Sequence, residues 1–309
     1  MPLTREDILR AFEGVRRAQN DGRYAPHKPL LLLLALARIQ RGEPRLTSLL
    51  RIEQKLKSLL DEFGPTGAAN RRHLPFWHLQ SDRGGALWEV TRSAALVGHS
   101  TGSTPTLGAL RQLGVEAGFS EEVQQALAAD PALIRQAAKR VLDAFFPATL
   151  HEDIAAEAGI ELTPAITEST GVPAPLRRRD PAFRERMLRA YEYRCCVCGF
   201  DLRVRHVPAG LEAAHIHWHT AGGPDVEPNG LSLCALHHKL FDLGAFTIEP
   251  AEHRVLFSQH AISGERGLTG VLAHHGKPLL LPTEKQHRPG PEFLTWNRQN
   301  VFKRPERSV

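Results

Sequence analysis

Two pairs of metal-ligating residues constrain how the second half of this chain folds. Cys195 and Cys198 form a CxxC pair closed by Gly199, and Cys234 and His237 form a CxxH pair where a helix is expected to begin. Three thiolates and one imidazole complete a tetrahedral shell without a further ligand. The spacing predicts a structural Zn²⁺, whose binding supplies folding free energy to a segment with few large apolar residues.

Cys196 is the remaining cysteine of the four in the chain. The pattern favours a side chain that faces away from the metal, and a shift of register that makes Cys196 the ligand is the alternative. With three cysteines used for metal, a disulfide framework is not expected.

A second set of residues is interleaved with the zinc pairs. Residues 211–216 read LEAAHI, and residues 229–242 read NGLSLCALHHKLFD. From about residue 181 to 246 the chain resembles the HNH endonuclease family. The resemblance implies the ββα-metal arrangement, with His215 ending the first strand, Asn229 in the connecting loop and His238 on the helix.

The resemblance also implies a role for each of these residues. His215 would act as the general base that takes a proton from water, for which its near-neutral pKa is suited. Asn229 would brace the loop and so orient the ring of His215. His238 would hold one divalent cation, Mg²⁺ or Mn²⁺, against the scissile phosphate.

One position departs from the family pattern. Many members carry Asp or His directly before the catalytic His as a second metal ligand, and here that residue is Ala214. Asp242 lies one helical turn after His238 and is favoured as the substitute by spacing, with pairing to a nearby cationic side chain as the alternative. Glu212 is the second candidate, although its odd spacing from His215 places it on the other face of a regular strand.

The composition of the chain and the positions of its proline and glycine residues indicate two domains and the α+β fold class. Residues 162–176 are rich in proline, glycine and hydroxyl side chains and are predicted to be a linker between domains at 1–161 and 177–309. The first domain is expected to be mainly helical with a small β component, and the second to be the zinc-stabilised ββα-metal module. Expected helices cover residues 5–21, 30–41 and 47–64 and follow Ser120 and Asp130; a strand is expected at 87–90.

The charge distribution favours a polyanionic partner. The formal charge is +5, and nine Arg against four acidic residues fall between positions 176 and 205. The longest apolar run, residues 30–37, is shorter than the roughly 20 residues that cross a bilayer. We expect a cytoplasmic protein with neither a signal peptide nor a membrane-spanning segment.

Two segments of the first domain carry another resemblance. Residues 24–32 read YAPHKPLLL, and residues 73–79 read HLPFWHL, followed by LWE at 87–89. Over about residues 1–160 the chain resembles the sulfur-binding domain of restriction endonucleases that recognise phosphorothioated DNA. The resemblance implies a sulfur pocket and DNA contacts formed by Leu74, Pro75, His78, His27, Lys28, Arg71, Arg72 and Arg111.

The physics of such a pocket limits what sulfur attraction can achieve. Burial of about 50 Å² of sulfur at about 25 cal/mol per Å² gives about 1 kcal/mol, under a tenfold preference. Most discrimination would come from stripping water from an ordinary phosphate oxygen that finds no donor, roughly 1–3 kcal/mol or more for a charged group. Arginines that contact guanine would add base preference.

Together these patterns predict a modification-dependent restriction endonuclease that cuts double-stranded DNA carrying phosphorothioate. An HNH enzyme directed at methylated DNA is the nearest alternative, and a zinc-stabilised DNA-binding protein with an inactive nuclease site is the other. Since one HNH site acts on one strand at a time, cutting both strands suggests a homodimer.

Overall fold

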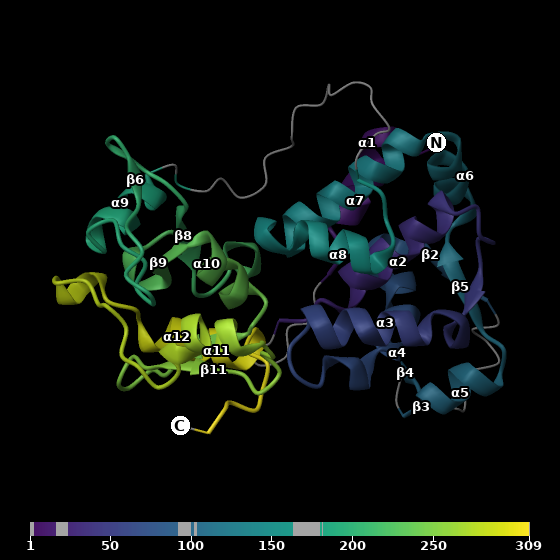
Figure 1. Ribbon diagram of the computed structural model, residues 1–309. Coiled ribbons are helices and arrows are strands. Elements are labelled where there is room, and N and C mark those ends of the chain that lie inside the picture. Colours follow the sequence, from purple (N-terminus) through teal and green to yellow (C-terminus); the bar gives the residue numbers. More distant parts are fainter. Residues whose placement is uncertain are drawn as a thin grey trace. The chain divides into compact units, whose positions relative to one another are not determined.

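The chain forms two compact units, of which the first ends at Ala174. The computed structural model describes residues 3–16, 24–91, 100–101, 104–162, 180 and 182–308. From residue 163 on, the predicted linker lies outside the described residues, as do parts of the helix expected at 5–21. Figure 1 labels the helices and strands of both units.

The first unit is mainly helical. Its α-helices are α1 (Arg5–Glu13), α2 (His27–Gln40), α3 (Leu49–Phe63), α4 (His73–His78), α5 (Leu107–Gln112), α6 (Glu121–Ala129), α7 (Pro131–Phe145) and α8 (His151–Ala158). Every residue from Pro29 to Ala37 in α2 is buried. A helix that is apolar all round has to be covered on all sides, and α3, α4, α6, α7 and α8 contact it.

A small antiparallel sheet completes this unit. Its strands are β1 (Thr47–Ser48), β5 (Glu116–Phe119) and β2 (Trp88–Val90), in the order β1-β5-β2; β3 (Ser100–Thr101) and β4 (Thr104–Pro105) form a separate pair. The strand expected at 87–90 is therefore confirmed. The mainly helical domain with a small β component is confirmed as well.

Local signals predicted most helix starts in the first unit. Thr4 caps α1 in a capping box, and the Asp130 carboxylate accepts from the amides of Ala132 and Leu133 at the start of α7. Three expectations were displaced. Helix α1 ends at Glu13, with Gly14 as its cap, whereas the helix was expected to continue to residue 21. Helix α2 begins at His27 instead of residue 30, because proline is tolerated in the first turn, where amides lack helical partners. Thr47 lies in β1, so α3 starts after Ser48.

The second unit is built around a β-hairpin and a helix. Strand β8 (Leu211–His215) pairs antiparallel with β9 (Gly230–Cys234), with His215 opposite Gly230, and α10 (Ala235–Asp242) follows at once. Helices α9 (Phe183–Ala190) and α10 both contact the hairpin. This is the ββα arrangement predicted from the sequence, with His215, Asn229 and His238 on the expected elements.

Other elements surround this centre. They are β6 (Arg203–Val204), β7 (Val207–Pro208), β10 (Phe246–Ile248), β11 (Val255–Phe257), α11 (Glu265–Gly270) and α12 (Pro291–Asn300). Short 3₁₀ helices cover Ala68–Arg71, Leu79–Gly85, Ala148–Leu150, His219–Ala221, Glu227–Asn229, Leu272–His274 and Lys285–His287. Among the described residues, no helix has both the length and the apolar character needed to cross a membrane.

The last helix closes the second unit. Leu294 of α12 and Phe302 after it are buried, and Phe293 packs against the core of the unit. Trp296 stacks on the His217 ring, with ring centroids 4.1 Å apart. The C-terminal helix therefore packs on the core of this unit.

Candidate functional site

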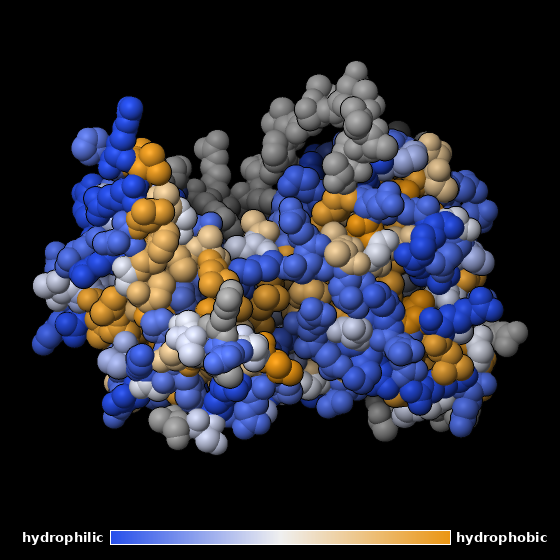
Figure 2. All heavy atoms as spheres, in the orientation of Figure 1, coloured by the Kyte–Doolittle hydropathy of each residue, from blue (hydrophilic) through white to orange (hydrophobic). Residues whose placement is uncertain are grey.

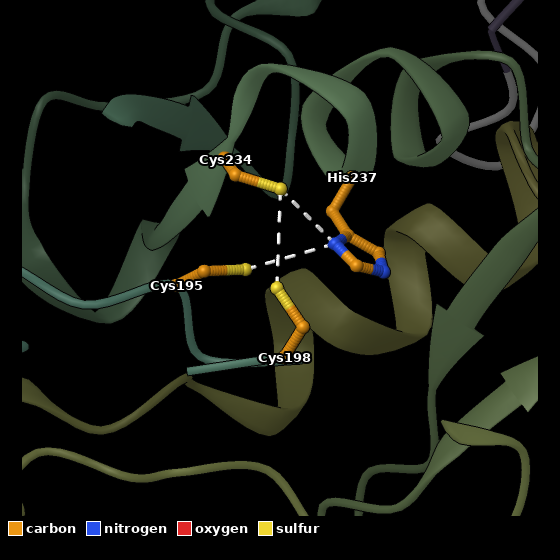
Figure 3. A group of neighbouring side chains, drawn as sticks. All are labelled: Cys195, Cys198, Cys234 and His237. Carbon is orange, nitrogen blue, oxygen red and sulfur yellow. Dashed lines mark hydrogen bonds between the residues drawn. The ribbon is translucent and has the colours of Figure 1, made fainter. Parts of the chain in front are cut away.

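The four predicted zinc ligands come together from a loop, the end of a strand and the start of a helix (Figure 3). The CxxC pair lies on the loop after α9, Cys234 ends β9, and His237 is in the first turn of α10. All four donor atoms lie within 4.8 Å of one another. Cys234 Sγ lies 3.2 Å from His237 Nδ1, and Cys198 Sγ lies 4.0 Å from Cys234 Sγ.

These spacings fit a tetrahedral metal ion. With Zn–S bonds of about 2.3 Å, the sulfurs of a regular tetrahedron lie roughly 3.8 Å apart. Hydrogen bonds from Cys198 and Cys234 hold the pKa of the Cys195 thiol far below its usual range. Burial acts to lower the pKa of His237, but its contacts with Cys195 and Cys234 outweigh burial and raise the pKa to about 9. The four donor atoms thus crowd around one point, where a single cation can contact all of them.

Cys196 lies outside this cluster, as expected. Its side chain is fully buried in the core of the unit, and its amide donates to the Ser232 carbonyl at 2.8 Å. Burial raises the pKa of the Cys196 thiol well above its ordinary value, so it stays a neutral apolar filler.

His215 is held from two sides at the end of β8. Its Nε2 lies 2.7 Å from Oδ1 of Asp225, and its ring stacks on Phe183 of α9, with centroids 4.4 Å apart. His219 Nε2 lies 3.8 Å from the other oxygen of Asp225. The ring of His215 is thereby fixed in one orientation by a carboxylate and an aromatic face.

Asp225 was missed by the reasoning from sequence. Burial acts to raise its pKa, but the Asp180 amide, which donates to Oδ2 at 2.8 Å, and the charge-assisted contact with His215 lower the pKa overall. Arg186 also donates to the backbone carbonyl of Asp225 at 3.0 Å. The only sequence signal was its place after the turn at residues 220–224.

Asn229 is fully buried in the loop between β8 and β9 and makes three hydrogen bonds there. Its Oδ1 accepts from the His217 amide at 2.8 Å, and its Nδ2 donates to the carbonyls of His217 and Pro224 at 3.0 and 2.9 Å. Asn229 thus closes the loop whose end carries Asp225. The link from Asn229 to His215 runs through the backbone and Asp225.

His238 lies between two carboxylates. Its Nδ1 is 2.5 Å from Glu212 Oε2, and its Nε2 is 3.2 Å from Asp242 Oδ2. Burial acts to lower the pKa of His238, but the negative charges of Asp242 and Glu212 outweigh it and raise the pKa to about 9. The hydrogen bond from His238 in turn lowers the pKa of Glu212. Both substitute acids named from the sequence therefore reach this histidine.

The two acids differ in their access to solvent. The Glu212 side chain is 45% exposed, whereas that of Asp242 is 2% exposed and also accepts from Trp218 Nε1 at 3.1 Å. Ala214 is fully buried. Burial along β8 does not alternate from residue to residue, because helices α9 and α10 both pack against the strand. The odd spacing between Glu212 and His215 therefore does not keep the Glu212 carboxylate from His238.

The residues predicted to read sulfur gather where α2 and α4 meet. His27 Nε2 lies 2.8 Å from the Ala68 carbonyl, and the Lys28 ammonium contacts both oxygens of Asp82 at 2.8 Å. His78 Nε2 lies 3.1 Å from Thr104 Oγ1. Burial, and then the nearby Lys28 charge, lower the pKa of His78, which places those two side chains together.

His73 joins this group, although it was quoted above only as part of a motif. Its Nδ1 is buried and has no hydrogen-bond partner in the described part of the chain. Leu74 is partly exposed, whereas Pro75 is buried. Of the apolar pair predicted for the pocket, Leu74 is the one that presents its side chain to solvent.

The three predicted arginines have different surroundings. Arg72 Nε and Arg111 Nε donate to the two oxygens of Glu53, at 2.7 and 3.0 Å. These hydrogen bonds lower the pKa of Glu53, which stays a carboxylate shared by both arginines. Arg71 is exposed at the end of its 3₁₀ helix, and its charge contributes to lowering the pKa of His27, after burial.

The chain is similar to known proteins in both units. Residues 5–163 match the family described as ScoMcrA-like, DNA sulfur-binding domain, and residues 195–249 match the family described as HNH endonuclease. No curated protein matches the chain significantly.

Three solved structures illustrate the likeness. The sulfur-binding domain of ScoMcrA complexed with phosphorothioated DNA is 28% identical, covering 49% of this chain and 97% of that one, with a TM-score of 0.42. The Type IV phosphorothioation-dependent restriction endonuclease ScoMcrA is 26% identical over 61% of this chain and 34% of that one, with a TM-score of 0.40. The sulfur-binding domain of SprMcrA complexed with phosphorothioated DNA is 21% identical over 51% of this chain and 94% of that one, with a TM-score of 0.41.

The first match covers more than half of the chain, and the second contains His215, Asn229, His238 and the four clustered Cys and His side chains. The chain belongs to the ScoMcrA-like DNA sulfur-binding domain family and is a nuclease by its second, HNH endonuclease domain.

Proposed function

We propose that this chain is a restriction endonuclease that binds phosphorothioated double-stranded DNA with its first unit and hydrolyses nearby phosphodiester bonds with its second. The observation that supports the proposal is that one chain matches both the sulfur-binding family and an HNH unit in which His215 contacts Asp225 and His238 contacts Glu212.

In the proposed mechanism His215 takes a proton from the attacking water. Since Nε2 faces Asp225, Nδ1 is the atom assigned to this step. Asp225 is a positioning residue: it fixes the tautomer and stabilises the imidazolium that forms, as carboxylates do for catalytic histidines elsewhere. Phe183 limits rotation of the ring by stacking.

Glu212 and His238 Nδ1 are the proposed ligands of the divalent cation. The exposed carboxylate and one imidazole nitrogen leave room for water and phosphate oxygens, which Mg²⁺ and Mn²⁺ prefer. Asp242 contacts the opposite ring nitrogen and so orients the ring, as a hydrogen-bond acceptor does for most metal-binding histidines. When bound, the cation neutralises charge on the scissile phosphate.

Recognition is assigned to the group around α2 and α4. Leu74 is the proposed apolar contact for sulfur, backed by the buried Pro75, with His27, Lys28 and His78 beside it. Arg71 is the proposed phosphate contact. Arg72 and Arg111, held by Glu53, supply positive charge to the surface, and either reaches DNA only if its contact with Glu53 rearranges.

Cleavage of one plasmid prepared with and without phosphorothioation tests the proposal, with Mg²⁺ and with Mn²⁺. We expect cutting of the modified plasmid alone, abolished by His215→Ala with DNA binding retained. Equal cutting of both plasmids would refute the sulfur specificity, and cutting by the His215→Ala protein would refute the mechanism. The homodimer stays a prediction, to be tested by sedimentation on bound DNA.

A further inference from the structure

Exposed apolar side chains concentrate on one hairpin of the second unit. Strands β6 and β7 pair through Arg203 opposite Pro208 and Val204 opposite Val207. Leu202, Val204 and Val207 are 58%, 66% and 68% exposed, and Phe200 at the base is 38% exposed. In Figure 2 the region that carries β6 in Figure 1 shows hydrophobic residues beside strongly hydrophilic ones.

The hairpin is anchored to the elements that carry the chemistry. The Cys195 amide donates to the Phe200 carbonyl at 2.9 Å, which joins the hairpin to the zinc-binding loop. The Ala235 amide donates to the Gly210 carbonyl, also at 2.9 Å, which joins it to the start of α10. Its direction is therefore fixed relative to His215 and His238 in the same unit.

The charge on the hairpin selects among possible partners. Arg203, Arg205 and His206 lie among the apolar residues, and residues 202–210 contain no Asp or Glu. All three basic residues are exposed. A positive ribbon with apolar side chains fits duplex DNA, where cations contact phosphates and apolar groups contact base edges or unstack a base step.

A second copy of the chain is a poorer partner for the same surface. Two such hairpins face to face would bring arginines of both copies together without a carboxylate on either ribbon. A stable dimer also buries about 1,600 Å² in total, more than a ribbon of a few residues can supply alone.

We propose that the β6–β7 hairpin is a DNA-contacting element of the second unit, with Val204 and Val207 against the bases of a groove and Arg203 and Arg205 on phosphates. It rests on the proposed function, in that the unit acts on duplex DNA. From Gly210 to His215 an extended chain covers about 17 Å, roughly five base-pair steps. A duplex seated at His215 thus passes the root of the hairpin.

Binding of an unmodified duplex to the full-length His215→Ala protein, measured by fluorescence anisotropy across a salt series, tests this proposal. For Arg203→Gln with Arg205→Gln, we expect the slope of log affinity against log salt to become shallower by about 1.8. For Val204→Ser with Val207→Ser, we expect about tenfold weaker binding at an unchanged slope. The controls are Ile262→Ser, an apolar residue 91% exposed in the same unit, and Arg254→Gln, which should both bind like the parent.

Parent-like affinity and slope for both double variants would overturn the proposal. So would a dimer in DNA-free sedimentation that the valine substitutions convert to monomer, since the hairpin would then join two chains. Because the duplex carries no sulfur, the result is independent of phosphorothioate specificity. Loss of that specificity with intact hairpin effects would reject the proposed function alone.

Discussion

The substitution Asp225→Asn tests whether the Asp225 carboxylate positions His215 for proton transfer. The substitution keeps the size of the side chain but leaves one oxygen where the carboxylate uses two, one for the Asp180 amide at 2.8 Å and one for Nε2 of His215. What it removes is the negative charge 2.7 Å from Nε2 of His215. The imidazolium that forms when His215 takes a proton then loses its counter-charge.

The magnitude follows from the contact that is lost. A hydrogen bond to a charged group contributes about 1.5–3 kcal/mol. At 1.36 kcal/mol per tenfold in rate, that loss slows the chemical step by about 10- to 150-fold. The larger end applies if the amide turns its NH₂ group toward Nε2, since His215 would then be driven to the wrong tautomer.

The assay is single-turnover cleavage of phosphorothioated DNA by saturating enzyme. We expect a slower chemical step together with unchanged affinity for the DNA, unchanged zinc content and an unchanged melting temperature of the second unit. Glu265→Gln, at an exposed acid in the same unit but outside the β6–β7 hairpin, is the control and should cleave like the parent. Parent-like rates for Asp225→Asn would refute the positioning role, and a rate loss that merely follows unfolding would refute it too.

Three further results are expected. Cys198→Ser should lose zinc and unfold the second unit, because binding of a structural zinc contributes about 10–16 kcal/mol in small domains; limited proteolysis with zinc analysis checks this, and Cys196→Ala should keep its metal. Since the pKa of His238 is raised to about 9, Mn²⁺ must displace a proton from this side chain when it binds. The affinity of the protein for Mn²⁺ should therefore rise about tenfold per pH unit up to about pH 9. Calorimetry in two buffers of different ionisation enthalpy should detect the released proton. Asn229→Ala removes three hydrogen bonds to backbone groups, so urea unfolding should show a loss of about 3 kcal/mol in the second unit.

The parts that sequence could predict depend on short spacings. A CxxC pair on a tight loop and a CxxH pair at a helix start place their donors by local geometry alone, and the four atoms do lie within 4.8 Å. The hairpin that brings His215 opposite Gly230 follows from strands flanking one loop. Helix caps such as Thr4 and Asp130 are local for the same reason.

What sequence could not predict depends on contacts between separate segments. Asp225 reaches His215 because Asn229 closes the intervening loop, and no spacing rule encodes that closure. Spacing favoured Asp242 over Glu212 as a ligand, but spacing does not indicate that Asp242 is buried and Glu212 exposed, because burial depends on how α9 and α10 pack against β8. Glu53 likewise joins Arg72 and Arg111 across distances of 19 and 58 residues.

The proposed division of labour requires the second unit to bind DNA weakly. Non-specific DNA affinities lie around 10⁻⁴–10⁻⁶ M, and a tethered module acts at an effective concentration of about 1 mM. If the second unit binds DNA with a Kd of about 10 µM, it is bound to about 99% of the DNA molecules that the first unit already holds. At about 10 nM protein, it is bound to only about 0.1% of the DNA molecules that the first unit does not hold. Sulfur binding then decides which DNA is cut, even though the sulfur contact itself is small. If the hairpin gave the second unit a higher affinity for DNA, that unit would cut DNA without the first. Two arginines and a few exposed apolar residues therefore suit the β6–β7 hairpin better than a larger basic surface would.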